Sequence, residues 1–201
     1  IRERVRRVLD ASDTPTVVIA HSLGSVVAYD VLSNPPGRPR DVPLFVTVGS
    51  PLGIDAVKEL VHQPTVVPPG VAAWLNVADP LDIAAADPEL RDDYGGSSQI
   101  RDVAVFNPAW FPHDLAGYLS TREIRDAVGL GDVPCEVAFL GHLVVLRRRR
   151  LEQPRHQRAC VVGGRIAREH LAQLPDRLVR MTPLGEQLLI SLDPEEHHGH
   201  L

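Results

Sequence analysis

The chain of 201 residues contains only two cysteines, Cys135 and Cys160, and their spacing is not that of metal ligands. A disulfide framework is therefore not expected, and a reducing, cytoplasmic location is the default prediction. No apolar run is long enough to span a membrane, and the N-terminal segment lacks the apolar region of a secretory signal. The sequence thus predicts neither a transmembrane segment nor an exported, disulfide-stabilised domain.

The chain also lacks a strong charge of either sign. Its formal net charge is −5, with 23% charged and 44% apolar residues. A mild acidic excess gives no reason to expect a nucleic-acid partner, and the basic run at residues 147–150 is interpreted as a solvated face. The apolar content is sufficient for one sizeable core.

One short segment stands out. An apolar, β-branched run at residues 16–20 is followed by Ser22, then by Gly24 and at once by a helical pattern. Strand, tight turn and helix in this order are typical of a nucleophile elbow, in which the serine Oγ stands exposed above a sheet. Ser22 is the predicted nucleophile, and the backbone N–H of Leu23 is the predicted oxyanion donor. The alternative is an ordinary connection in which Ser22 only caps the helix.

Strand and helix patterns alternate over the first half of the chain. Residues 16–20, 43–48, 73–77 and 100–106 have the patterns of buried strands, and residues 1–9, 24–32 and 54–61 those of helices. This alternation predicts an α/β fold with a mostly parallel sheet and crossover helices. Reactive groups in such sheets collect beyond the carboxyl ends of the strands, where Ser22, Ser50, Asp79 and Asp82 all fall.

A histidine and a carboxylate can complete a catalytic set with Ser22. A serine hydroxyl is a poor nucleophile until a base takes its proton. A histidine side chain can accept that proton because it ordinarily titrates near neutral pH. His113 follows the fourth predicted strand, so the chain order is Ser, Asp, His. The carboxylate would hold the imidazole in the right tautomer.

Four sequence blocks resemble the α/β-hydrolase superfamily, and within it lipase-type and GPI inositol-deacylase-like bacterial serine hydrolases. The blocks are AHSLGS at residues 20–25, VTVGSPLG at 46–53, WLNVADPLDIA at 74–84 and HDLAGYL at 113–119. The resemblance covers about the first 125 residues and implies that Ser22 is the nucleophile and His113 the base. Asp82, which precedes a small apolar run, is similar to the lipase acid. Asp79 before a proline is typical of a turn, and it remains the alternative acid.

The resemblance also implies an N-terminally incomplete fold. In a complete α/β-hydrolase several strands precede the elbow, and an early loop supplies the second oxyanion N–H. We expect residues 1–130 to form the catalytic core, and residues 131–201 to be an extension that is either a small interaction region or partly disordered. Within it, residues 135–146 have the pattern of a strand or buried helix, and residues 184–192 that of a short amphipathic helix.

The implied reaction is hydrolysis of carboxylic esters, lipid esters among them, through an acyl-enzyme and without a metal or organic cofactor. Two alternatives stay open. One is an inactive hydrolase-like interaction module, whose partner is another protein or a missing N-terminal segment. The other is an acyltransferase with the same triad.

Other residues near these motifs have structural interpretations. Ser50 is predicted to be a turn residue, because no helical pattern starts directly after it. His21 is expected to point away from the nucleophile and to have its own partner. Asp114 is predicted to cap a helix. Trp74 and Tyr118 are expected to pack in the core, with lining of a pocket as the alternative.

Overall fold

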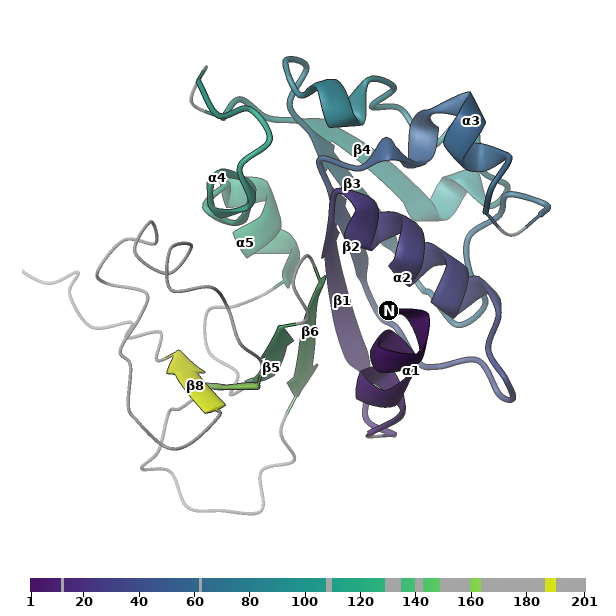
Figure 1. Ribbon diagram of the computed structural model, residues 1–201, viewed down its shortest axis with the longest axis vertical. Coiled ribbons are helices and arrows are strands. Elements are labelled where there is room, and N and C mark those ends of the chain that lie inside the picture. The colour runs from purple at the N-terminus through teal and green to yellow at the C-terminus, as the bar shows by residue number, and fades with distance from the viewer. Residues whose placement is uncertain are drawn as a thin grey trace, which may run out of the picture.

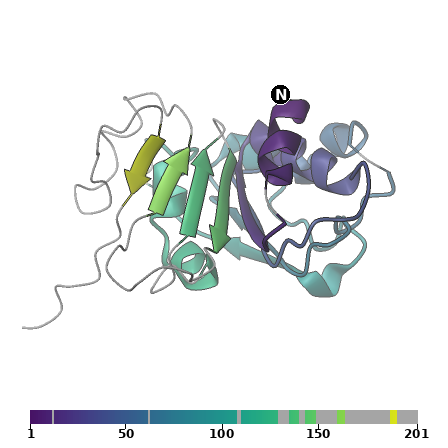
Figure 2. The same cartoon turned by 90° about the horizontal axis from the view of Figure 1, so that it is seen from below.

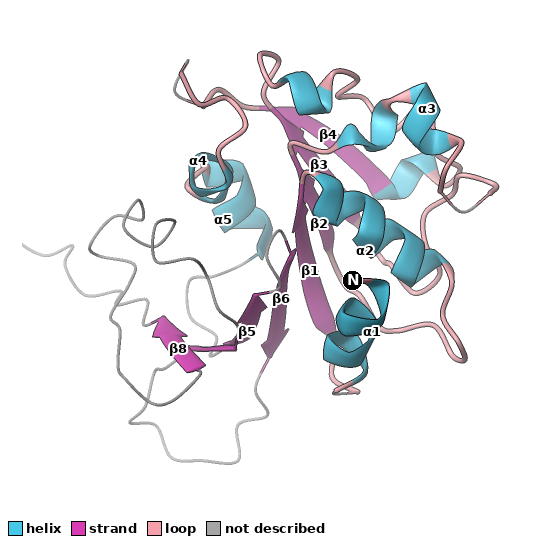
Figure 3. Cartoon of the chain, in the orientation of Figure 1, coloured by secondary structure: helices cyan, strands magenta, loops and turns pink. Residues whose placement is uncertain are grey.

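The computed structural model describes residues 1–11, 13–61, 63–107, 110–128, 135–139, 143–148, 160–163 and 187–190. Its central feature is a row of four parallel strands in the order β4-β3-β2-β1 (Figure 1). The strands are β1 (Thr16–His21), β2 (Phe45–Val48), β3 (Trp74–Ala78) and β4 (Ile100–Ala104). Helices and strands alternate along this part of the chain, so the predicted α/β fold is confirmed (Figure 3).

The register of the strands determines which residues meet at one edge of the sheet. His21 pairs with Val48, and Val48 pairs with Val77. The carboxyl ends of β1, β2 and β3 are therefore level, and the residues that follow them come together at the same edge.

Helices cover both faces of the parallel strands. The helices α1 (Arg2–Asp10) and α2 (Leu23–Ser33) pack on one face, and α4 (Leu115–Leu119) and α5 (Arg122–Val128) on the other (Figure 1). Alternate strand residues belong to two separate hydrophobic clusters: Val18 and Trp74 pack with α1 and α2, whereas Ile19 and Leu75 pack with Tyr118 and Ile124. Because both faces are covered, β1 to β3 are apolar almost throughout.

Short elements complete the loops between the strands. They are η1 (Pro51–Gly53), α3 (Asp55–Lys58), η2 (Ile83–Ala85) and η3 (Ser97–Gln99). The helix predicted over residues 54–61 is thus only one turn long. Its last residue, Lys58, forms ion pairs with Asp55 and with Asp93 on a distant loop.

Four further strands extend the same sheet beyond β1, in the order β1-β6-β5-β7-β8 (Figure 2). They are β5 (Cys135–Phe139), β6 (Leu143–Arg148), β7 (Cys160–Gly163) and β8 (Gln187–Ile190). Within the apolar segment 135–146, the described residues 135–139 and 143–146 therefore form strands. The prediction of a helix over residues 184–192 is wrong for Gln187–Ile190, which is a strand paired with β7. Short apolar runs fit the periodicity of a helix and that of a strand. The described residues of 131–201 are these four strands, and the disorder predicted for part of this extension lies otherwise outside the described residues.

None of the helices in the described ranges has both the length and the apolar character that crossing a membrane requires.

A cluster of aromatic rings joins α2 to the sheet. The ring of Tyr29 lies 5.7 Å from that of Trp74 and 5.3 Å from that of Tyr94, measured between centroids. The Tyr29 hydroxyl donates to the carbonyl of Val66 at 3.0 Å and accepts from its N–H at 3.1 Å. One buried side chain thus holds the long loop between α3 and β3.

Replacing Tyr29 by phenylalanine should lower the free energy of unfolding by about 1–3 kcal/mol, because both polar groups of Val66 lose their partner. Urea denaturation measures this change. Leu60→Ala, at an exposed position, is the control and should change stability by less than about 0.5 kcal/mol. An unchanged midpoint for Tyr29→Phe would contradict the assigned role of the hydroxyl.

Candidate active site

Ser22 occupies a strained turn between β1 and α2. Its backbone angles are φ 55° and ψ −135°, and it is the only non-glycine residue with a positive φ in the described ranges. Such a conformation persists only where surrounding contacts impose it, and it is typical of functional sites. The Ser22 N–H donates to the carbonyl of Val48 at 3.1 Å, and the Ser25 N–H donates to the Ser22 carbonyl at 2.9 Å. Although Ser22 stands at the N-cap position, its side chain makes no capping bond.

The Ser22 hydroxyl is instead paired with His113. The His113 Nε2 atom lies 2.9 Å from Ser22 Oγ, and Nδ1 lies 2.8 and 2.9 Å from the two Asp82 oxygens. A carboxylate only accepts hydrogen bonds, so the ring proton belongs on Nδ1. The Nε2 atom of the neutral ring is then an acceptor for the Ser22 hydroxyl. The geometry is that of a nucleophile, a base and an orienting acid.

Asp82 is held by two further donors. Its side chain is fully buried, its Oδ1 accepts from the Ala84 N–H at 2.9 Å, and its Oδ2 accepts from the Tyr118 hydroxyl at 2.7 Å. Burial, and after it the hydrogen bond to Asp82, raises the pKa of the Tyr118 phenol. The phenol therefore stays protonated at neutral pH and remains a donor. For Tyr118 core packing was preferred over a pocket-lining role, and its side chain is fully buried. The structure adds a hydrogen bond to Asp82.

Asp79, the alternative acid, has other partners. Its Oδ1 accepts from the Leu81 N–H at 2.8 Å and its Oδ2 from the Asn107 N–H at 2.6 Å. Its own N–H donates to the Tyr118 hydroxyl at 3.0 Å. Asp79 is buried and joins the loops that follow β3 and β4. The structure thus brings Asp82, rather than Asp79, to His113.

Gly49, at the end of β2, allows the acid and the base to approach the sheet. Its φ is +52°, and a Cβ atom there would lie 2.6 Å from Asp82 Oδ2 and 3.1 Å from His113 Nδ1. It would also lie 3.0 Å from a ring carbon of Tyr118. No side chain fits this position without moving the Asp82–His113 pair. Gly49 was not among the predicted site residues, although a glycine directly after a buried strand can indicate that another group approaches the backbone closely.

The loop before α4 presents His113. Asp114 caps α4, as predicted, by accepting from the Gly117 N–H at 2.7 Å. The buried His21 has a partner, also as predicted: its Nε2 lies 3.1 Å from the His113 carbonyl, so its ring fixes the backbone of the base. The rings of His21 and His113 are 4.5 Å apart.

The prediction for Ser50 needs a correction. A 3₁₀ helix, η1, starts directly after it, and the Ser50 Oγ accepts from the Leu52 N–H at 3.2 Å. Ser50 is therefore a helix cap rather than a plain turn residue. Pro51 occupies the first position of η1, where its fixed φ suits a helix and its missing N–H leaves no donor unpaired.

Leu23, the predicted oxyanion donor, is the first residue of α2. The first N–H groups of an α-helix have no acceptor within the helix, and they lie at the positive end of its dipole. The Leu23 N–H is thus suited to an anion that forms beside Ser22. As for metals, no group of three His, Cys, Asp or Glu side chains within the described ranges could hold an ion.

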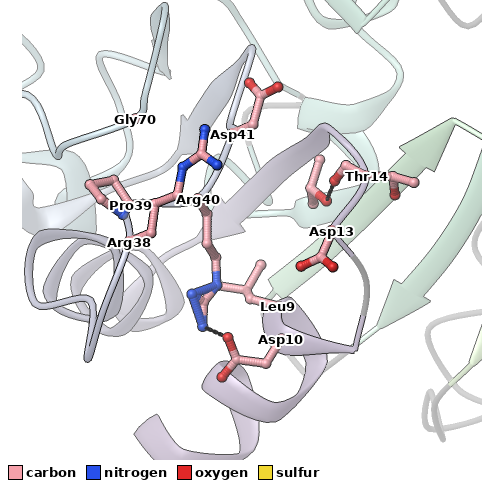
Figure 4. A pocket seen from close by; sticks show the side chains of 10 residues that line it. Leu9, Asp10, Asp13, Thr14, Arg38, Pro39, Arg40, Asp41 and Gly70 are labelled. Atoms are coloured by element: carbon pink, nitrogen blue, oxygen red, sulfur yellow. Dashed lines mark hydrogen bonds and ion pairs between the residues drawn. The ribbon is translucent and has the colours of Figure 1, made fainter.

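A cavity of about 840 Å³ lies at the other end of the sheet, near the start of β1 (Figure 4). Its lining combines arginines and aspartates, and Arg40 forms an ion pair with Asp10 there. None of Ser22, Asp82 and His113 lines it. The candidate site is therefore the strand-end cluster and not this cavity.

Comparisons with protein-family models, with curated proteins and with solved structures found no match for this chain. The interpretation of the site therefore depends on its geometry.

Replacing Gly49 by alanine should slow the reaction of Ser22 with a serine-directed fluorophosphonate about a hundredfold, because the new methyl displaces Asp82 and His113. The rate of labelling measures this effect. Gly37→Ala is the matched control, since a Cβ there meets no atom within 4 Å. Equal labelling rates for the two variants would contradict the role assigned to Gly49.

Proposed function

We propose that the chain is a serine hydrolase of the α/β-hydrolase type, which cleaves carboxylic esters through an acyl-enzyme. The observation that carries this proposal is one continuous chain of hydrogen bonds from Tyr118 through Asp82 and His113 to Ser22. Every contact in it is between 2.7 and 2.9 Å long. The chain of hydrogen bonds ends at Ser22, whose backbone is strained and whose side chain makes no capping hydrogen bond to α2.

The α/β-hydrolase assignment is supported by the positions of the three residues. The nucleophile follows β1 and precedes α2, the acid follows β3, and the histidine follows β4. The strand–turn–helix context is the one that the elbow motif requires. Parallel order and level carboxyl ends bring the three residues to one edge of the sheet.

In the proposed reaction, Ser22 Oγ attacks the ester carbonyl while His113 Nε2 takes the hydroxyl proton. Asp82 stabilises the resulting imidazolium, and the Leu23 N–H donates to the oxyanion. The C–O bond to the alcohol then breaks, and His113 returns the proton to the departing oxygen. Water, deprotonated by His113, attacks the acyl-enzyme and releases the carboxylic acid together with free Ser22.

The surroundings of the triad support an apolar substrate. Exposed apolar side chains are adjacent to all three members: Leu23 follows Ser22, Leu81 and Ile83 flank Asp82, and Phe111 precedes His113 by two residues. Water-exposed apolar side chains that neighbour the reactive residues in the chain favour contact with apolar parts of a ligand. Esters with long acyl chains are therefore the proposed substrates.

Ser22→Ala should abolish covalent labelling by a fluorophosphonate probe, because the probe reacts with an activated serine oxygen. Mass spectrometry of the labelled peptide identifies the residue. Ser97→Ala is the control: this exposed serine in η3 precedes β4, at the opposite end of that strand from the site. Absence of labelling in the folded wild-type chain would contradict the hydrolase proposal and favour an inactive interaction module.

Long-chain p-nitrophenyl esters should be better substrates than p-nitrophenyl acetate. Ile83→Ser should lower kcat/KM for the octanoate about tenfold and leave that for the acetate unchanged, because in this proposal only the octanoyl chain contacts the exposed Ile83 side chain. Leu60→Ser, equally exposed but after α3, is the control. The same loss for both esters would contradict an acyl-chain contact at Ile83.

A further inference from the structure

Two buried hydroxyl groups lie behind the elbow, and the triad mechanism uses neither. Ser25, in the first turn of α2, is fully buried, and Ser50, after β2, is nearly so. Ser25 Oγ is 2.6 Å from the Ser22 carbonyl oxygen and 2.7 Å from Ser50 Oγ. The Leu52 N–H lies 3.2 Å from Ser50 Oγ.

The chemistry of these groups fixes the direction of every hydrogen bond. A carbonyl oxygen only accepts, so the Ser25 hydroxyl donates to Ser22. Ser25 Oγ is then an acceptor for the Ser50 hydroxyl, and Ser50 Oγ is the acceptor for the Leu52 N–H. All protons therefore point toward the Ser22 carbonyl, and hydrogen bonds aligned in this way polarise one another.

The Ser22 carbonyl belongs to the same peptide group as the Leu23 N–H. This peptide is trans, as is every peptide of the described ranges except Gln63–Pro64. In a planar trans peptide the N–H points away from the C=O. Anchoring the carbonyl on Ser25 therefore aims the Leu23 N–H away from Ser25.

We propose that the Ser50–Ser25 hydroxyl pair is a positioning device for the oxyanion donor: it fixes and polarises the Ser22–Leu23 peptide group. This inference rests on the proposed hydrolase function and adds two positioning residues to it. The same pair joins the elbow to the end of β2, where the absence of a Cβ atom at Gly49 leaves space for Asp82 and His113. Nucleophile, oxyanion donor and base thus share one support.

The test compares kcat/KM for p-nitrophenyl octanoate in Ser25→Ala, Ser50→Ala and the double variant. Ser25→Ala should lose about tenfold to a hundredfold, somewhat less than the loss of an oxyanion donor itself, and Ser50→Ala about threefold to tenfold. Because the hydroxyls act in series, the double variant should match Ser25→Ala within about twofold rather than show the product of both losses. Ser33→Ala removes a buried hydroxyl from the other end of α2 and should retain full activity.

A second readout separates positioning from general damage to the fold. Octylboronic acid forms an anionic tetrahedral adduct with a reactive serine, and its affinity should fall in parallel with kcat/KM. The KM for the neutral ester should remain within about twofold of wild type, because the ground state carries no oxyanion. Urea denaturation confirms that each variant is folded under the assay conditions.

The outcomes are distinct. If the wild type is labelled by fluorophosphonate but both single variants retain the activity and boronate affinity of Ser33→Ala, the positioning role is overturned while the hydrolase stands. Multiplicative losses in the double variant overturn the serial arrangement. A wild type that is not labelled overturns the hydrolase proposal and, with it, this inference.

Discussion

The turn at Ser22 is the constraint on which the rest of the site depends. Its positive φ is unfavourable for a residue with a side chain, so the conformation must be imposed by neighbouring bonds. Those bonds come from β2 through the Val48 carbonyl and from α2 through both donors of Ser25. The paired strands and the first turn of the helix therefore hold the serine in a position that the local backbone alone would not adopt.

The end of β2 supports both halves of the triad. Val48 accepts from the Ser22 N–H, Gly49 leaves free the space that a Cβ atom would take from Asp82 and His113, and Ser50 contacts Ser25 beneath the elbow. Three consecutive residues thus set the distance between the nucleophile and the acid–base pair. A shift of this strand end would change the positions of Ser22, Asp82 and His113 together. Residues 48–50 therefore matter to the site although none of them belongs to the proposed triad.

Much of this arrangement could be predicted from the sequence because it depends on local patterns. The four parallel strands appeared as apolar runs, and the elbow as a serine between a strand and a helix. The preference for Asp82 over Asp79, and the assignment of His113, depended on the resemblance to lipase-type hydrolases. Contacts between segments that are distant in the chain could not be predicted. They include the hydrogen bonds from Tyr118 to Asp82 and between Ser25 and Ser50, and the close approach of Asp82 and His113 to the backbone at Gly49. Short apolar runs were also ambiguous, and Gln187–Ile190 is a strand where a helix was expected.

The two aspartates after β3 show why the choice of acid needed a structure. Each accepts from the N–H two residues ahead, Asp79 from Leu81 and Asp82 from Ala84, so their local hydrogen bonding is the same. They differ in a second partner that comes from the loop after β4. For Asp79 that partner is the backbone N–H of Asn107, a permanent donor that ties two loops together. For Asp82 it is the ring of His113, whose side chain is 40% exposed and whose other nitrogen faces Ser22. Asp79 therefore ties the loop after β4 to the end of β3, whereas Asp82 orients the partly exposed ring of His113 toward Ser22, which is what the proposed mechanism requires of the acid.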